Sequence, residues 1–260
     1  MRNLVVTTPG RPTDTTVNKA KITAGDLSIP YVKRNKQSIY KMMEEHNSNV
    51  IVTADQMTVH TPDMPPFFFH PNAAMFRAKR WLKTKEDPLT DVCRLKDGDV
   101  FFDATMGMGS DAIIASLAVG TTGKVIGSEV SPLIAYIVKE GLKSYDSNVI
   151  EVNEAMRRIK VLSAANLDWL EQAADNTADV VYFDPMFQEA VAGSTGFDPM
   201  RPYALTNPLT GKLISEALRV ARKRVVLKDH FRSHRFQQFG FKVQVRPSAT
   251  YHFGTIELKD

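Results

Sequence analysis

An acid, a proline and an aromatic residue end the apolar run VVYF at residues 180–183: Asp184, Pro185 and Phe187. One reaction that these residue types could assist is that of an amine conjugated to a base ring. Such an amine is a poor nucleophile, because its lone pair is delocalised into the ring. Acceptors that hold its hydrogens let the nitrogen pyramidalise and react. The carboxylate of Asp184 and the carbonyl of Pro185 can be such acceptors, and Phe187 can stack on the base. The plainer interpretation is a strand-ending turn, because Asp-Pro commonly breaks regular structure.

A second acid, Asp103, ends the apolar run at 99–104 and precedes Gly107 and Gly109. In a doubly wound sheet the ligand crevice lies beyond the strand ends, where glycine lets the backbone turn tightly. The third glycine of a dinucleotide fingerprint is missing, and an acid ahead of the glycines suits a cationic ligand better than a pyrophosphate. This combination is typical of S-adenosylmethionine enzymes, although a glycine turn alone is common in α/β proteins.

A third acid, Glu129, lies at the end of the next expected strand, KVIGSEV at 124–130, about 20 residues after the glycines. An acid at this spacing can accept hydrogen bonds from both ribose hydroxyls of a nucleoside. Ser131 is the better cap for the following helix, so we favour the ribose role for Glu129 over a capping role. Together with Asp103, it predicts a site for a nucleoside cofactor.

The pattern from residue 95 onward predicts an α/β fold, because short apolar runs alternate with helical patterns. The expected strands are 99–104, 124–130, 160–164, 178–184 and 223–229, with a terminal hairpin within 241–258. The expected helices are 110–120, 131–145, 153–159, 167–173 and 208–221. These elements predict a doubly wound, Rossmann-like sheet of seven mostly parallel strands.

The first 65 residues predict a separate small α/β domain. Its elements are an apolar strand at 4–8, helices near 13–25 and 36–46, and a hairpin within 49–61. We therefore expect three parts: a small domain at 1–65 that binds substrate, a connector at 66–94 that folds over the active site, and the main domain at 95–260.

Composition indicates a globular protein. The chain has 260 residues, 43% hydrophobic and 24% charged, enough for a sizeable core without metals or disulfides. It has one cysteine, Cys93, no secretion-signal pattern at its start, and no run of roughly 18 apolar residues, so we expect a cytoplasmic protein that does not enter a membrane. The net charge of +4 is compatible with an RNA partner, although basic runs are as often solvated faces.

Several motifs resemble successive signatures of one enzyme family. They are FFFHPNAAMFRAKR, FFDATMGMGSDA, NEAMRRIKV, DVVYFDPMF, MRPYA and EALRVARKRVVLK. The chain resembles a branch of the class I S-adenosylmethionine-dependent methyltransferases that is similar to the bacterial small-subunit ribosomal RNA guanine-N2 methyltransferases. The resemblance implies the cofactor S-adenosylmethionine and a guanine amine in ribosomal or other structured RNA as substrate.

The resemblance also implies roles for individual residues. It implies that the cofactor contacts Asp103, Thr105, Gly107, Gly109, Asp111 and Glu129, and that the base contacts Asp184, Pro185 and Phe187. The chain departs from the family after the third strand, where an acid is expected to touch the adenine amine and Asn166 stands instead. Asn166 can replace that acid as the acceptor. The acid that follows, Asp168, can lie too far along the chain to reach the adenine. Met186 differs from the double proline of adenine-N6 enzymes and matches the guanine-N2 branch.

Four flanking residues are further candidates for substrate binding. His70 and Asn72 lie in the connector, where His70 can position substrate or shuttle a proton, although a structural histidine is more common. Arg201 and Lys228 lie where a phosphate would pass, although a salt bridge is the commoner role. We expect no metal site, because His230 and His234 have no partner at metal-ligand spacing.

Two other functions stay open. One is a methyltransferase of the same fold that acts on a small molecule or a protein, and the other is a catalytically silent module that binds nucleosides or RNA. The oligomeric state also stays open.

Overall fold

The computed structural model describes residues 3–185, 199–205 and 207–258, apart from the side chains of residues 72 and 73. Within these ranges the chain divides into two units. Unit 1 contains residues 3–70 and 199–204, and unit 2 contains residues 71–185, 205 and 207–258. The division at residues 70 and 71 falls inside the expected connector.

Unit 2 is built on a seven-stranded sheet with the order β10-β11-β9-β8-β5-β6-β7. Its strands are β5 (Val100–Asp103), β6 (Lys124–Glu129), β7 (Lys160–Ser163), β8 (Ala178–Phe183), β9 (Ala221–His230), β10 (Lys242–Gln244) and β11 (Tyr251–Glu257). Strands β5 to β9 are parallel, and β11 is antiparallel to β9 and β10. The doubly wound, mostly parallel sheet predicted from the sequence is therefore present.

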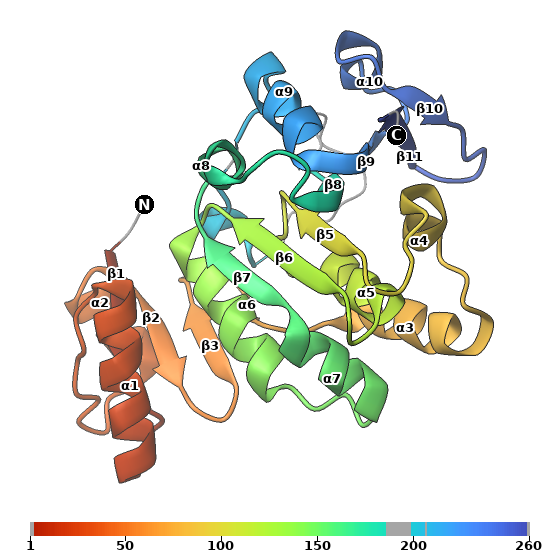
Figure 1. Ribbon diagram of the computed structural model, residues 1–260. Helices are drawn as coiled ribbons and strands as arrows, with labels where there is room; N and C mark the ends of the chain where they lie inside the picture. Colours follow the sequence, from red (N-terminus) through yellow and green to blue (C-terminus); the bar gives the residue numbers. More distant parts are fainter. Residues whose placement is uncertain (1–2, 186–198, 206, 259–260) are drawn as a thin grey trace. The chain divides into compact units, whose positions relative to one another are not determined.

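Helices cover both faces of this sheet (Figure 1). They are α3 (Asn72–Thr84), α4 (Pro88–Cys93), α5 (Ser110–Val119), α6 (Pro132–Ser144), α7 (Ile150–Arg158), α8 (Asn166–Gln172), α9 (Gly211–Val220) and α10 (Arg235–Gln238). Helices α8, α9 and α10 pack on one face, and α3 to α7 lie on the other. The core on the α9 face is apolar and includes Phe102, Val181 and Leu213, all of which are buried.

The strand order reverses between β5 and β8, since β5 pairs with β6 on one side and with β8 on the other. A crevice at such a switch point is where open α/β sheets bind their ligands. The three acids singled out in the sequence follow or end these strands at their carboxyl ends: Asp103, Glu129 and Asp184. The topology therefore gathers them at one edge of the sheet.

Unit 1 has a four-stranded sheet with the order β1-β2-β3-β4. Its elements are β1 (Asn3–Thr7), α1 (Asp14–Leu27), α2 (Ile39–Glu45), β2 (Ser48–Thr53), β3 (Met57–His60), β4 (Phe67–Phe68) and the short 3-10 helix η1 (Arg201–Tyr203). Strands β1 and β2 are parallel, while β3 is antiparallel to β2 and β4. Because β4 lies beyond residue 65, the N-terminal sheet extends into the expected connector.

Unit 1 has a core of its own between α2 and the sheet, with Val5, Met42 and Val50 at its centre. The ring of Phe67 stacks on that of Tyr203, at 6.0 Å between centroids, and the hydroxyl of Tyr203 bonds that of Thr61. These contacts attach η1 to the N-terminal sheet, although more than 130 residues of chain separate them.

Among the described residues, no helix has the length and apolar character needed to cross a membrane.

Candidate functional site

The turn after β5 depends on two glycines with left-handed backbone conformations. Gly107 has φ +49° and Gly109 has φ +75°, a region that other residues rarely adopt. A Cβ at Gly109 would also lie 3.0 Å from Cε of Met106. The sequence GMG therefore sets a tight turn at the start of α5.

Glu129 closes this turn from the end of β6. Its Oε2 accepts a hydrogen bond from the Gly107 N–H at 3.1 Å, and its Oε1 accepts one from the Ser131 N–H at 2.8 Å. Burial raises the pKa of Glu129, and these two N–H groups oppose that rise. The carboxylate therefore lies against both the glycine turn and the start of α6, and its contact with a ribose stays a prediction.

Asp103 is the buried acid at the end of β5. One of its oxygens, Oδ1, accepts a hydrogen bond from the Thr105 N–H at 3.1 Å, and no described residue donates to the other. Burial, reinforced by nearby Asp111, raises the pKa of Asp103 well above its ordinary value. A cationic ligand group beside this carboxyl would stabilise its charged form.

Asp184 lies at the tip of β8 beside the glycine turn. Its backbone N–H donates to Oγ1 of Thr105 at 2.6 Å, so Thr105 joins the two strand ends. Its carboxylate is 28% exposed and accepts a hydrogen bond from Nζ of Lys228 at 2.6 Å. Pro185, which follows it, is buried, and Phe187 lies outside the described residues.

Burial raises the pKa of Asp184 to about 6, although Lys228 opposes the rise and Asp111 adds to it. With Lys228 beside it, the carboxylate is therefore predominantly ionised at neutral pH. An ionised, partly exposed carboxylate at a strand tip can accept hydrogen bonds from an amine.

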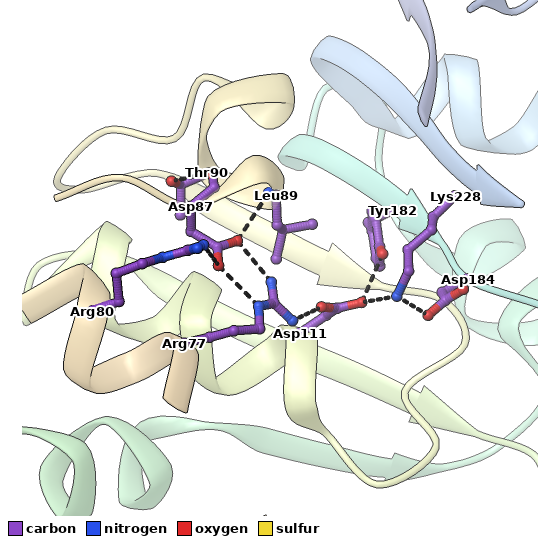
Figure 2. A network of polar contacts seen from close by, with 9 residues as sticks. All are labelled: Arg77, Arg80, Asp87, Leu89, Thr90, Asp111, Tyr182, Asp184 and Lys228. Carbon is purple, nitrogen blue, oxygen red and sulfur yellow. Dashed lines mark hydrogen bonds and ion pairs between the residues drawn. The ribbon is translucent and has the colours of Figure 1, made fainter. Parts of the chain in front are cut away.

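A network of ionic side chains extends from Asp184 across unit 2 (Figure 2). Lys228 bridges Asp184 and Asp111, with Nζ 3.1 Å from Oδ2 of Asp111. Asp111 also accepts a hydrogen bond from the hydroxyl of Tyr182 at 2.7 Å and pairs with Arg77. Burial alone would raise the pKa of Asp111, but Lys228 and Arg77 hold it well below its ordinary value.

The network continues to Asp87, whose side chain is fully buried and also pairs with Arg80 at 3.5 Å. Arg77 donates to both of its oxygens, from Nε at 2.9 Å and from Nη2 at 2.7 Å. Asp87 also caps α4 through the N–H of Leu89. A chain of alternating charges therefore connects α3 and α4 to Asp184 (Figure 2).

Two residues that were predicted to contact a ligand, Asp111 and Lys228, pair with other side chains of the protein. The carboxylate of Asp111 is held by Arg77, Tyr182 and Lys228, and Lys228 forms salt bridges, which the sequence already suggested as the commoner role. Cofactor contact by Asp111 and phosphate contact by Lys228 stay predictions.

Asn166 also bonds within the protein. Its Nδ2 donates to the carbonyl of Ala104 at 3.0 Å, and its Oδ1 accepts from the N–H of Leu167 at 2.8 Å. The buried amide thus joins the end of β5 to the start of α8, and a contact with adenine stays a prediction.

The remaining substrate candidates are His70, Arg201 and Asn72. His70 and Arg201 belong to unit 1, where the His70 ring meets Phe68 edge-on at 6.0 Å and Arg201 begins η1. Asn72 begins α3, but its side chain lies outside the description. Their roles at a substrate site stay predictions.

Sequence reasoning missed Arg77, Asp87 and Tyr182. Arg77 stood within a basic run, and Tyr182 within the apolar run VVYF. One signal was present: Asp111 opens the apolar helix α5, and a buried acid there requires a cation or hydrogen-bond donors. The sequence alone does not say which residues provide them.

The arrangement fits a nucleoside ligand that carries a positive charge. Asp103 offers a buried carboxylate oxygen, the glycine turn offers a close backbone approach, and Glu129 lies against the turn at the adjacent strand end. Within the described ranges, no group of three or more His, Cys, Asp or Glu side chains is placed to hold a metal ion.

Comparisons with known proteins agree with this chemistry. The family described as "Putative SAM-dependent methyltransferase" matches residues 34–244. The protein YpiP of Bacillus subtilis is 44% identical over 254 residues, 97% of this chain and 99% of that protein. The ribosomal RNA small subunit methyltransferase J of Nitrosococcus oceani is 30% identical over 191 residues, 69% of this chain and 72% of that enzyme.

A solved structure has a similar fold. The SAM-dependent methyltransferase from Neisseria gonorrhoeae superposes with a TM-score of 0.59 at 15% identity, and the match covers 97% of this chain and 95% of that one.

Proposed function

Because the chain belongs to the S-adenosylmethionine-dependent methyltransferase family, we propose that it methylates an exocyclic amine, guanine N2, of a base in structured RNA. Ribosomal RNA is the first candidate, since the relative from Nitrosococcus oceani is named as a ribosomal RNA methyltransferase. Met186, which matches the guanine-N2 branch, favours guanine over adenine.

S-adenosylmethionine, the cofactor of this family, supplies an electrophilic methyl group when it is bound. In the proposal, the carboxylate of Asp103 holds the cationic amino end of the methionine moiety. Glu129 accepts hydrogen bonds from the ribose hydroxyls, and the glycine turn lets the backbone approach closely. The buried carboxyl of Asp103, which has an oxygen with no donor among the described residues, supports this orientation.

The observation that carries the proposal is the state of Asp184: charged, partly exposed and held at the tip of β8. Lys228 keeps the carboxylate ionised, and Thr105 fixes its backbone. Asp184 accepts a hydrogen bond from the amine of the base, so the nitrogen can pyramidalise. With bound S-adenosylmethionine as the methyl donor, the nitrogen would gain the methyl group and lose one proton, which would pass by way of the Asp184 carboxylate to solvent.

Alignment of the reacting atoms provides most of the acceleration in such a transfer, roughly 7 kcal/mol or more. A base inside a helix must first leave its stack to reach a strand tip. Attack by a cysteine on the base ring is disfavoured, because Cys93 is buried in α4 and burial raises the pKa of its thiol.

The test is transfer of labelled methyl from S-adenosylmethionine into RNA from cells that lack the gene, followed by nucleoside mass spectrometry. We expect label in N2-methylguanosine. Asp184→Ala should lower transfer by about 100-fold or more, the scale of a lost transition-state contact, while cofactor affinity stays within a few-fold. Asp103→Ala should instead weaken cofactor binding.

Glu154→Ala is the matched control, because Glu154 is an exposed acid on α7. It should leave both transfer and cofactor binding unchanged. Full activity of Asp184→Ala would refute the acceptor role. Label only in protein or small-molecule fractions would refute the RNA substrate and favour the alternative substrates.

A further inference from the structure

The end of the β9–β11 strand pair carries an unusual concentration of basic and aromatic side chains. Tyr251 pairs with His230, and Phe253 pairs with Lys228, across the antiparallel ladder. Residues 230–253 contain four Lys or Arg residues, three histidines and no acidic residue. This end of β9 is its carboxyl end, and because β8 pairs with β9 in parallel, Asp184 lies at the same edge of the sheet.

Arg246 is held at this end by aromatic rings. Its guanidinium lies 4.5 Å from the ring centroid of Tyr251 and 5.7 Å from that of Phe253. Its side chain is half-buried, its Nη1 is a buried atom with no hydrogen-bond partner, and it forms no ion pair with any described acid. The charge is therefore positioned by stacking and left without a counterion from the described parts of the chain.

A second group of rings and charges lies beside it. Phe231 is 41% exposed, and its ring lies 4.5 Å from that of His230 and 6.1 Å from that of His252. The guanidinium of Arg232 lies 5.0 Å from the Phe231 ring, and no described acid pairs with it. An exposed aromatic face and a second uncompensated cation therefore follow β9 directly.

This surface is continuous with the candidate active site. Nζ of Lys228 lies 5.0 Å from the ring centroid of Tyr251 and 2.6 Å from Oδ2 of Asp184. Contacts thus lead from Arg246 through Tyr251 and Lys228 to Asp184 without leaving unit 2. A chain whose base reaches Asp184 has these side chains as neighbours.

We propose that the end of the β9–β11 pair, with Phe231, Arg232, Arg246 and Tyr251, binds the unpaired RNA strand that flanks the target base. The exposed ring of Phe231 takes a stacked base, and guanidinium groups without counterions take phosphates; single-stranded nucleic acid offers both. An acidic peptide would satisfy the charges but leave the rings without partners of matching shape. The inference rests on the proposed function for its choice of RNA.

The test measures binding of the full-length protein to a fluorescein-labelled 12-nucleotide single-stranded RNA at several salt concentrations. We expect Arg232→Gln/Arg246→Gln to weaken binding by about tenfold or more and to reduce the salt dependence, because two phosphate contacts are lost. We expect Phe231→Ala to weaken binding by about tenfold through the loss of one stacked base.

Lys124→Gln/Lys160→Gln is the matched control. Both lysines are exposed and begin parallel strands at the opposite, amino-terminal edge of the same sheet. This pair removes the same charge and should change RNA affinity by less than about twofold. Binding of S-adenosylhomocysteine should stay equal in all variants and so report that unit 2 is folded.

The outcomes separate this inference from the proposed function. If the wild type and the Arg232→Gln/Arg246→Gln variant bind RNA equally tightly, the proposed RNA-binding surface is wrong, even if the wild type methylates RNA. Failure of the wild type to bind the RNA, or tighter binding to a labelled polyglutamate peptide, overturns it as well. RNA binding that depends on these residues, without methyl transfer to RNA, supports the surface and refutes the proposed function.

Discussion

Lys228 determines the charge of Asp184. A carboxyl group at this depth is pushed toward its neutral form by burial and by nearby Asp111, and Lys228 opposes both effects from 2.6 Å. An acceptor role requires the ionised form, because a protonated carboxyl donates from one of its oxygens. Lys228 is therefore a positioning residue that acts through Asp184.

We predict that Lys228→Met moves the acidic limb of the pH–rate profile to higher pH. In the wild type, activity should fall as pH drops through the pKa of Asp184, about 6. Without the cation, this pKa should rise by about 1 to 3 pH units. Transfer should then be nearly absent at pH 6 and recover at alkaline pH, as measured by methyl transfer between pH 5 and 9.

Lys223→Met is the control on the same strand. Lys223 also bridges two acids, with Nζ 2.6 Å from Asp99 and 3.2 Å from Asp179, but at the amino-terminal end of β9. Its removal should leave the position of the acidic limb unchanged. If Lys228→Met lowers activity by the same factor at every pH, Lys228 does not control the charge of Asp184.

At the scale of elements, Met106 fills the space between β6 and the glycine turn. A Cβ at Gly127, in the middle of β6, would lie 2.2 Å from Sδ of Met106. Met106 is buried, and its N–H donates to the carbonyl of Ser128 at 3.0 Å. The absence of a side chain at Gly127 therefore lets the turn pack onto β6.

We predict that Gly127→Ala weakens S-adenosylhomocysteine binding by about tenfold, because overpacking costs roughly 1–3 kcal/mol and Met106 must shift with the turn. The double variant Gly127→Ala/Met106→Ala should recover part of the affinity, because the smaller side chain at residue 106 makes room for the new Cβ. Calorimetric titration measures both. Gly211→Ala is the control and should have no effect, because a Cβ there meets nothing within 4 Å. If Gly127→Ala binds S-adenosylhomocysteine as tightly as the wild type, the turn does not depend on this packing.

The sequence predicts elements well where burial is strong. Strands β5 and β8 read as largely apolar runs, and β6 has the apolar pair Val125 and Ile126. Each is followed or ended by an acid, so their place at one sheet edge could be predicted. Weak elements were missed for physical reasons. Strand β4 has two residues and follows two prolines, and α10 has four residues. The terminal hairpin was predicted, although β10 is shorter than its alternating pattern indicates.

At the scale of the molecule, the candidate site depends on pairs that are distant in the chain. Lys228 and Asp111 are separated by 117 residues, and Lys228 and Asp184 by 44. Local patterns identify which residues carry charge, but the fold decides which charges meet. For this reason Asp184, Asp103 and Glu129 could be selected from the sequence, whereas the links from Lys228 to Arg77 and Asp87 could not.

We predict that Arg77→Met destabilises unit 2 by about 3–5 kcal/mol, the cost of an uncompensated buried charge. Asp87 is fully buried, and Arg77 binds both of its oxygens; Arg80, at 3.5 Å, is a poor substitute. Urea unfolding followed by tryptophan fluorescence measures the loss. Both tryptophans, Trp81 and Trp169, lie in unit 2, so the signal reports on this unit alone.

Two variants sharpen this prediction. Asp87→Asn added to Arg77→Met should recover much of the loss, because the amide removes the unpaired charge and its oxygen can still cap α4 through the N–H of Leu89. Lys143→Met, which breaks an exposed pair with Glu140, should cost less than about 1 kcal/mol.

Arg77 and Lys228 also hold the pKa of Asp111 below its ordinary value, so this part of the stability is present at neutral pH and is lost as acidification protonates Asp111 in the folded state. The difference between wild type and Arg77→Met should therefore shrink at strongly acidic pH, and a difference independent of pH would mean that Arg77 acts by packing rather than by charge.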